Sequence, residues 1–295
     1  MRGKRRKKSG ALRLVLPSAA LCAAVVLLIA VLRSLHPAAQ RQEEDPHAGQ
    51  VYVNDGANMV WLTPRDGVAA SPLRRWQFVT LHERPYYQGS DFTARRGIDL
   101  SVFQGEVDWE KVAADGIEFA IVRLGYRGYG KGALQPDERF SSYISGAQAA
   151  GVDVGVYFFS QALTAEEGRQ EAEYVLEQLS GRDLELPIYF DWEPITAEDS
   201  RTNGYDYASL TDSAVAFCET IEVAGYEAGV YINRQQGYYH YDLSRLADYS
   251  LWVADYNSYP DFYYRFDVWQ YSSAGAVDGI DIQVDENLMF IEKQT

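Results

Sequence analysis

The sequence predicts an α/β fold in which residues 96–295 form a TIM-like (β/α) barrel. From Arg96 onward, apolar β-type segments alternate with amphipathic helical segments, the pattern of βα units around a parallel sheet. Eight such strands can be counted, the number that closes this kind of barrel. An open doubly wound sheet is the alternative. No glycine-rich phosphate-binding motif follows the first strand, so the sequence favours the barrel.

The expected strands differ in how many helices accompany them. The early ones are near-continuous apolar runs, as expected for parallel strands covered on both faces, and each is followed by a helical segment. The last three have few helical segments after them. In order, we expect strands at 97–101, 119–124, 154–159, 187–193, 229–232, 251–254, 266–271 and 280–282.

The helical segments carry start and stop signals. Asp108 can accept a hydrogen bond from the first turn of a helix that follows it. Thr164 and Glu167 form a capping box at the start of another helix. The expected helices cover 109–115, about 140–150, the stretch between Thr164 and Gly181, and 209–224, where an apolar stripe faces the sheet.

The N-terminal segment predicts a membrane anchor. Residues 14–32 carry no charge and would be about 28 Å long as a helix, close to the roughly 30 Å hydrocarbon core of a bilayer. The basic cluster at residues 4–8 precedes this run, and positive charge stays on the cytoplasmic side. We therefore expect a cytoplasmic tail over 1–13 and a single-pass, uncleaved signal anchor over 14–32. Cleavage at Pro37-Ala38-Ala39 stays open, although the exit from the apolar run is a poor cleavage site.

Two further segments precede the barrel. Residues 33–50 are polar and predict a flexible linker. Residues 51–95 contain short β-type segments separated by Asn-Asp-Gly and Asp-Gly turns. We expect a small β-type appendage there, packed on the barrel and without chemistry of its own.

Charge and cysteine usage exclude several functions. Residues 1–33 carry eight basic and no acidic side chains, whereas the whole chain has a net charge of −15, so the remainder carries −23. Such an acidic region repels DNA, RNA and anionic lipid, and we expect no nucleic-acid partner. Cys22 and Cys218 lie in separate segments and the four histidines are scattered. We therefore expect no disulfide framework, no metal and no cofactor. We also expect the protein to be a monomer.

One short motif suggests acid–base chemistry. The expected strand at 187–193 ends in Asp191-Trp192-Glu193. Because side chains in a strand alternate between faces, Asp191 and Glu193 should point the same way. Two adjacent carboxylates repel and lose solvation, so one proton is held more tightly. Glycosidic bond cleavage needs such an acid beside an anion. On the motif alone, an ordinary surface pair at a strand end is the more common explanation.

Other residues strengthen the motif, because the carboxyl ends of barrel strands meet at one mouth. Asp99 comes late in the first expected strand, and Asp278 and Asp285 come near the last. These carboxylates should therefore converge with the Asp-x-Glu pair. Aromatic rings beside an acidic cleft suit sugars, whose C–H faces pack on rings, although any single ring is more often ordinary core. The rings in or next to these strands are Tyr157, Phe159, Tyr189, Trp192, Tyr231, Trp252, Tyr256, Trp269 and Tyr271.

Three motifs in order resemble a known family. Residues 97–105 read GIDLSVFQG and are followed by Val-Asp-Trp at 107–109. Residues 189–193 read YFDWE, and residues 269–273 read WQYSS before Gly-Ile at 279–280 and VDEN at 284–287. These segments resemble the opening, central and closing motifs of glycoside hydrolase family 25, the Chalaropsis-type lysozymes.

The resemblance implies a barrel of five βα units followed by three mostly helix-free strands, with β-1,4-N-acetylmuramidase activity on peptidoglycan. It implies that Glu193 is the general acid, that Asp191 stabilises the developing positive charge and that Asp99 lines the site. The family's further aspartate corresponds to Asp285 or Asp278, with Asp285 preferred. The family retains anomeric configuration, with the substrate's own N-acetyl group as internal nucleophile. The candidate substrate-binding residues are Asp285, Tyr157, Tyr231, Trp252, Tyr256, Trp269 and Gln270.

Two segments depart from the family pattern. After the second strand the family often has Lys-x-Ser/Thr-Glu-Gly, whereas this chain has RLGYR at 123–127. After the third strand it often has Tyr-His-Phe, whereas this chain has YFF at 157–159. Both positions flank the expected cleft, so they should alter glycan recognition and leave the Asp-x-Glu pair in place.

The sequence thus predicts a membrane-anchored muramidase that acts on peptidoglycan glycan strands outside the cell. We expect burial and Asp191 to raise the pKa of Glu193, while Asp191 stays ionised. A non-catalytic glycan-binding barrel is the second hypothesis, although a pure binder has no need for adjacent repelling acids. A divalent-metal site in a transferase is the third, disfavoured by the missing histidine ligands and nucleotide loop.

Overall fold

The computed structural model describes residues 25–31, 45–82 and 84–293, and all statements below concern these residues. The chain divides into two compact units, Met1–Ala48 and Gly49–Thr295. In the first unit a helix covers residues 25–31, within the expected anchor. The expected tail at 1–13, the anchor residues 14–24 and 32, and residues 33–44 of the linker lie outside the described residues. None of the described helices is long and apolar enough to span a membrane.

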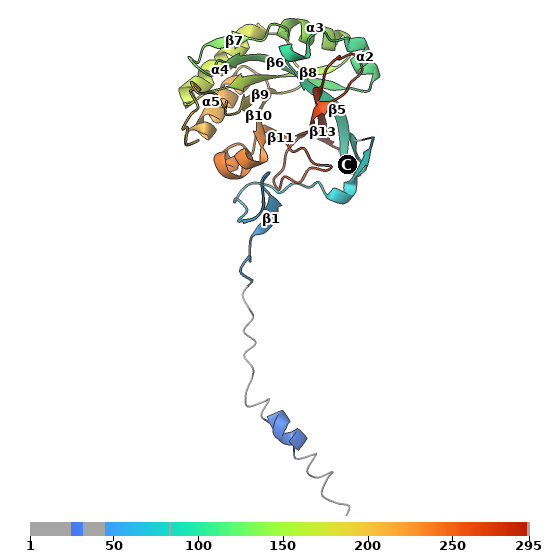
Figure 1. The fold of residues 1–295 in the computed structure, drawn as a ribbon, viewed down its shortest axis with the longest axis vertical. Helices are drawn as coiled ribbons and strands as arrows, with labels where there is room; N and C mark the ends of the chain where they lie inside the picture. The colour runs from blue at the N-terminus through green and yellow to red at the C-terminus, as the bar shows by residue number, and fades with distance from the viewer. Residues whose placement is uncertain (1–24, 32–44, 83, 294–295) are drawn as a thin grey trace, which may run out of the picture. The chain divides into compact units, whose positions relative to one another are not determined.

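The second unit is built around a closed eight-stranded barrel, as the strand count predicts (Figure 1). Around the barrel the order is β5-β13-β12-β11-β10-β9-β8-β6, and pairing of β5 with β6 closes the sheet. Seven strands run parallel, and β13 is antiparallel to both of its neighbours. The strands are β5 (Phe92–Leu100), β6 (Phe119–Arg127), β8 (Asp153–Ser160), β9 (Ile188–Trp192), β10 (Ala228–Asn233), β11 (Ser250–Ala254), β12 (Val268–Gly275) and β13 (Val284–Glu292).

The last strand is not where the sequence suggested. Residues 280–282 contribute only a single bridge between Ile280 and Val107, and the eighth strand is β13, which starts at Val284. Its first half contains Asp285, Glu286 and Asn287, and the last two are buried. Polar residues in a buried strand interrupt the apolar pattern by which such strands are recognised. The prediction of a strand at 280–282 was therefore wrong.

Helices cover the outside of the early strands (Figure 1). Asp108 accepts from the Lys111 N–H and Thr164 accepts from the Glu167 N–H, as predicted. The return bond of the predicted capping box differs, because Glu167 Oε2 accepts from the Leu163 N–H at 2.8 Å. After β10, however, only a π-helical turn (η3, Gln236–His240) and a 3-10 turn (η4, Leu243–Arg245) follow. Four βα units thus have a full α-helix, and the fifth has short turns. The helices are α2 (Trp109–Ala114), α3 (Phe140–Ala149), α4 (Ala165–Leu179) and α5 (Leu210–Val223).

Residues 51–87 form two antiparallel hairpins. The first pairs β1 (Val51–Asn54) with β2 (Met59–Leu62), and the second pairs β3 (Phe78–Leu81) with β4 (Arg84–Tyr87). The ring of Phe78 packs edge-on against Trp269 at 5.7 Å and Phe290 at 6.0 Å between centroids. The second hairpin therefore covers the outer face of β12 and β13, the strands that have no helix of their own. β5 begins at Phe92, before the expected barrel boundary at Arg96.

A separate core fills the inside of the barrel. Phe119, Tyr189 and Trp252 are buried there among other inward-facing side chains. Gly97 on β5 leaves the space that the Phe119 ring fills, because a Cβ at Gly97 would lie 2.4 Å from ring carbons. The filled interior closes the barrel below its mouth, where the polar residues gather.

Candidate active site

Four carboxyl groups meet at the mouth of the barrel. Asp99 and Asp191 lie near the carboxyl ends of β5 and β9, and Glu193 directly follows β9. Asp285 reaches the same mouth because β13 is antiparallel, so its first residues lie beside the last residues of β5. The backbone register pairs Asp285 with Asp99 directly. All four carboxyl groups line one pocket of about 280 Å³.

The strand alternation expected at the Asp-x-Glu motif holds. Asp191 and Glu193 both line the pocket, whereas Trp192 between them is buried in the core outside the barrel. The Trp192 indole N–H donates to the Ala162 carbonyl at 2.9 Å, which fixes the turn of the chain after β9. Asp191 is buried, and Glu193 is partly exposed and therefore open to a ligand.

Asp99 is held by two side-chain amides. Gln270 Nε2 and Asn287 Nδ2 each donate to Asp99 Oδ2 at 2.8 Å. Asn287 in turn accepts from the Trp252 indole N–H at 2.8 Å. Because the amide oxygen of Asn287 is occupied by this donor, its NH2 group is directed to Asp99. Trp252 therefore orients the support of Asp99 and also lines the pocket.

The Gln270 amide is oriented in the same way. Its Oε1 accepts from the Tyr231 hydroxyl at 3.0 Å and from the Tyr256 hydroxyl at 2.8 Å. Two donors at the oxygen leave the Gln270 NH2 group free to donate to Asp99. One hydrogen-bond network at the pocket thus joins residues from β5, β10, β12 and the loop after β11.

Burial raises the pKa of every carboxyl in the pocket, and repulsion adds to this shift for all of them except Asp285. Burial raises the pKa of Asp285 to about 6. Burial, and then the charge of Asp285, raise the pKa of Glu193. Burial, and then Asp285, also raise the pKa of Asp99 well above its ordinary value, against the two amide donors. The cluster therefore keeps protons at a pH where exposed carboxyl groups have lost them.

The division of roles expected between Asp191 and Glu193 needs correction. Burial, followed by repulsion from Glu193 and Asp99, raises the pKa of Asp191 well above its ordinary value, although Arg123 opposes this shift. Asp191 thus holds its proton more tightly than an exposed aspartate does, and the neighbouring charge that raises the pKa of Glu193 is that of Asp285. Among the described residues, Asp191 Oδ1 is buried and has no hydrogen-bond partner. A ligand that donates to this oxygen would favour the ionised form.

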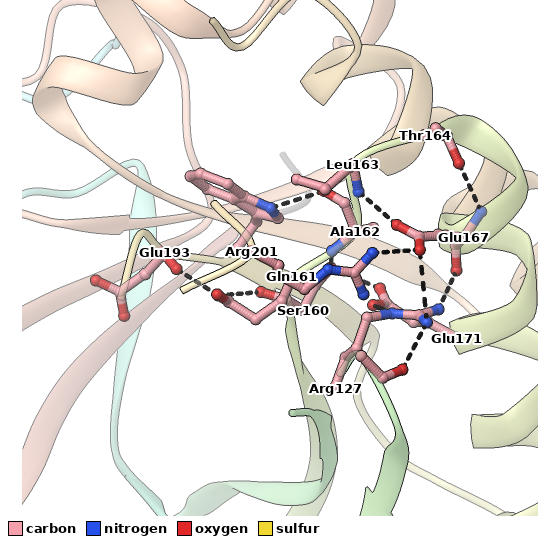
Figure 2. Close-up of polar contacts among 12 residues, drawn as sticks. Arg127, Ser160, Gln161, Ala162, Leu163, Thr164, Glu167, Glu171, Glu193 and Arg201 are labelled. Carbon is pink, nitrogen blue, oxygen red and sulfur yellow. Dashed lines mark hydrogen bonds and ion pairs between the residues drawn. The ribbon is translucent and has the colours of Figure 1, made fainter. Parts of the chain in front are cut away.

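A buried polar network holds the backbone at Glu193 (Figure 2). Gln161 Nε2 donates to the Glu193 carbonyl at 2.5 Å and to the Ser160 carbonyl at 2.8 Å. The Ser160 hydroxyl donates to Glu171 Oε2 at 2.6 Å, and Arg127 Nε donates to Glu171 Oε1 at 2.6 Å. In Figure 2 the Glu193 carboxyl group extends away from this network, which leaves it available on the pocket side.

The predicted aromatic residues divide into floor and rim. Tyr157, Tyr231 and Trp252 line the pocket but are largely enclosed, and Trp252 packs edge-on against Tyr231 at 4.7 Å between centroids. Tyr256 also lines the pocket and is 55% exposed. Tyr256 is therefore the predicted ring with an open face that a sugar could cover.

Two predicted candidates lie elsewhere. Trp269 does not line the pocket; it is buried on the outer face of β12 and donates from its indole N–H to the Asp255 carbonyl at 2.6 Å. Its neighbour Gln270 faces the pocket instead, because successive residues of a strand point to opposite faces. Asp278 is exposed in a turn and does not line the pocket, so Asp285 is the aspartate at the site.

The two segments that depart from the family pattern flank the pocket as predicted, because Arg123 and Phe159 both line it. Phe103 is a pocket residue that sequence reasoning did not assign. Arg123 pairs with Asp137 at 2.9 Å and lies over the Phe103 ring at 5.1 Å. Phe103 also lines the pocket and is 73% exposed. The apolar character of Phe103 gave no sign that it would be exposed, so this position could not be identified from the sequence.

Comparisons with known proteins agree with this geometry. The family described as "Glycosyl hydrolases family 25" matches residues 98–280. The autolytic lysozyme of Clostridium acetobutylicum is 27% identical over 192 residues, which are 64% of this chain and 54% of that protein. Lysozyme M1 of Streptomyces globisporus is 25% identical over 281 residues, 90% of this chain and 86% of that protein. This chain thus spans about half the length of the Clostridium relative.

A solved structure supports the fold. The modular autolysin LytC from Streptococcus pneumoniae is similar with a TM-score of 0.57 and 23% identity, over 82% of this chain and 57% of that chain. The family match covers the strands that carry Asp99, Asp191 and Gln270, as well as Glu193 directly after β9. The chain is an enzyme that belongs to glycosyl hydrolases family 25.

Proposed function

We propose that this protein hydrolyses the β-1,4 bond between N-acetylmuramic acid and N-acetylglucosamine in peptidoglycan. The observation that carries the proposal is the group of four proton-holding carboxyls in one pocket at the barrel mouth. Two lysozymes among the relatives, and the structure of LytC in complex with a synthetic peptidoglycan ligand, support the choice of substrate.

Glu193 is the general acid of the proposed reaction. It is partly exposed, and burial and Asp285 raise its pKa, so it holds its proton to a higher pH than an exposed glutamate does. As the bond from C1 of the muramic acid to the glycosidic oxygen breaks, the Glu193 proton passes to that oxygen. General acid catalysis of this kind contributes about 10² to 10⁴-fold in rate.

The substrate's acetamido group supplies the nucleophile. Its carbonyl oxygen bonds to C1 while the glycosidic oxygen leaves, which gives a cyclic oxazolinium ion. The unpartnered Oδ1 of Asp191 can accept the acetamido N–H, and this contact favours ionised Asp191 as positive charge develops. Water then adds to C1 as the bond between C1 and the acetamido oxygen breaks, and it gives a proton to Glu193. Muramic acid is left at the new reducing end with its acetamido group restored and its configuration retained.

Asp99 supports the reaction by its charge and position. Donation from Gln270 and Asn287 fixes its carboxyl group beside Asp285 at the pocket wall. A negative charge shared by Asp99 and Asp285 favours a positively charged transition state in the same pocket.

Mass spectrometry of digested, purified peptidoglycan tests the proposal. Fragments that end in a reducing N-acetylmuramic acid are expected. Fragments that end in reducing N-acetylglucosamine would assign the other glycosidic bond. Retention of glycan strands without any new reducing end would favour the alternative, a barrel that binds cell-wall glycan without cleaving it.

The sequence supports a location outside the cell. The uncharged run at 14–32 and the basic residues before it favour a single-pass anchor with a cytoplasmic N-terminus. The protein is proposed to trim nearby wall from this anchor. Fractionation of cells that express the full chain tests this location: activity should sediment with membranes and become sensitive to protease added outside the membrane. Release of the activity into the medium would contradict an uncleaved anchor.

A further inference from the structure

A second pocket adjoins the active site on the side of β10 and β11. Its volume is about 330 Å³, and it shares Glu193, Tyr231 and Tyr256 with the carboxylate pocket. The loop after β10 forms one wall, and the turn of the β1–β2 hairpin forms another through Asp55 and Gly56. The two pockets therefore adjoin each other, and the second lies between the catalytic centre and the N-terminal hairpin.

The hairpin turn is held in a defined shape. Asp55 is buried, and its Oδ1 accepts from the Ala57 and Asn58 N–H groups at 2.8 and 2.7 Å. Its Oδ2 accepts from the Tyr239 hydroxyl at 2.7 Å, which joins the turn to η3 of the barrel. Fixing a wall before a ligand binds lowers the entropy cost of binding.

Arg234 joins the hairpin to the barrel from the other side of this pocket. Its Nη1 lies 2.9 Å from Asp261 Oδ1 and 3.3 Å from Asp255 Oδ1. Asp261 Oδ2 also accepts from Asn54 Nδ2 at 3.5 Å, at the end of β1. Gly56 has a φ of +102°, and a Cβ there would lie 3.6 Å from Arg234 Nε, at van der Waals contact. A larger side chain at Gly56 would be strained and would narrow the pocket.

The lining chemistry suits a neutral, hydroxyl-rich ring. Asn233 and Gln235 contribute side-chain amides, and the ion pair between Arg234 and Asp255 balances charge within the wall. Tyr256 lines both pockets and presents an exposed ring between them. Such a ring packs on the C–H face of a pyranose, while amides bind hydroxyl and acetamido groups.

We infer that this second pocket is a glycan subsite, walled by the β1–β2 turn, that binds an N-acetylhexosamine unit beyond the two that flank the cleaved bond. The inference rests on the proposed glycan hydrolysis and adds a specificity-determining role for the N-terminal hairpin. Residues 51–62 lie outside the segment 98–280 that matches the family. This wall is therefore supplied by the chain's own N-terminal segment.

The test compares long glycan strands with the shortest glycan fragment that the wild type cleaves. Gln235→Trp places a bulky ring in the pocket, because Gln235 is exposed and lines it. The ratio of kcat/KM for long strands to kcat/KM for the short fragment should fall by about fivefold or more, the equivalent of roughly one lost hydrogen bond. Gln170→Trp makes the same exchange on the exposed surface of α4 and should keep the wild-type ratio.

A second variant tests the hairpin itself. Asp55→Ala removes the acceptor of the Tyr239 hydroxyl and of two turn N–H groups, so the ratio should fall in the same direction. An unchanged ratio in Gln235→Trp would overturn the subsite. A fall in Gln235→Trp without a fall in Asp55→Ala would overturn the role of the hairpin. Absence of glycan cleavage by the wild type would instead overturn the proposed function.

Discussion

At the residue scale, Asp285 has the widest influence on the site. It is paired in register with Asp99, and after burial its charge is the next cause that raises the pKa of both Asp99 and Glu193. Asp285 raises the pKa of Glu193 by charge repulsion alone, because no hydrogen bond joins the two carboxyl groups. The acid strength of Glu193 is thus set partly from another strand of the barrel.

We therefore expect Asp285→Asn to move the alkaline limb of the pH–activity profile to lower pH. Loss of the negative charge lowers the pKa of Glu193, so its catalytic proton is lost at a lower pH. The measurement is kcat/KM for peptidoglycan between pH 4 and 9. Asp278→Asn removes the same charge from an exposed turn outside the pocket and should leave the limb in place. If the alkaline limb of Asp285→Asn stays in place or moves to higher pH, Asp285 does not raise the pKa of Glu193.

Local periodicity explains which residues could be predicted. Asp191 and Glu193 were assigned to one face because alternation in a strand is independent of the rest of the fold. Trp269 was misplaced because the motif around it does not reveal which face points into the barrel. Asn287 supports Asp99 from a strand that the sequence did not reveal, so its role depends on tertiary structure.

At the element scale, close approach between strands and side chains determines barrel closure. Gly97 lies opposite Phe119 where β5 pairs with β6, the contact that closes the sheet. The Phe119 ring is fully buried inside the barrel and has no room to move aside. A glycine is required here by the space that the ring occupies.

Gly97→Ala should lower the free energy of unfolding by about 1–3 kcal/mol, the usual cost of overpacking a core. The added Cβ would lie 2.4 Å from the Phe119 ring. The measurement is urea-induced unfolding followed by circular dichroism. Gly128→Ala is the matched control, because a Cβ there would lie at van der Waals contact with the Ala133 backbone, 3.5 Å from its oxygen and 3.9 Å from its nitrogen. Equal stability of the Gly97 and Gly128 variants would refute the close-packing explanation.

The order of the strands and helices along the chain could be predicted more completely than the way in which they pair and pack. The βα alternation predicted the first seven strands and the helices between β5 and β10. The direction of β13 could not be predicted, because its polar residues face a buried site and break the apolar pattern. The covering of β12 and β13 by the second hairpin also depends on contacts distant in sequence, such as that between Phe78 and Trp269.

At the scale of the whole molecule, buried acids link stability to pH. Burial raises the pKa of Asp285 to about 6 and of Glu171 and Asp255 to about 7. These groups bind protons more tightly in the folded state than in the unfolded state, where carboxyl groups titrate near pH 4. The stability that they contribute is complete below about pH 4 and is lost as the pH rises to about 7. The pKa values of three other groups are lowered in the folded state, namely those of Asp55, Glu167 and Asp242. The stability that these groups contribute is present above about pH 4 and is lost only as the pH falls below it.

The thermal unfolding midpoint should therefore be higher at pH 5 than at pH 7.5, at constant ionic strength. The net charge of −15 acts in the same direction, because partial protonation relieves repulsion within the folded chain. Asp285→Asn removes one of the responsible groups and should reduce the difference between the two midpoints. A midpoint that rises from pH 5 to pH 7.5 would contradict the proton-holding cluster.

The most direct test of the account is the release of reducing ends from purified peptidoglycan by the Glu193→Gln variant. Gln keeps the shape of the side chain but has no proton to give, so turnover should fall by about 10² to 10⁴-fold while the fold stays intact. Glu198→Gln makes the same exchange at an exposed position in the loop after β9 and should retain wild-type turnover. Wild-type rates from Glu193→Gln would contradict the assignment of the catalytic proton to this carboxyl group.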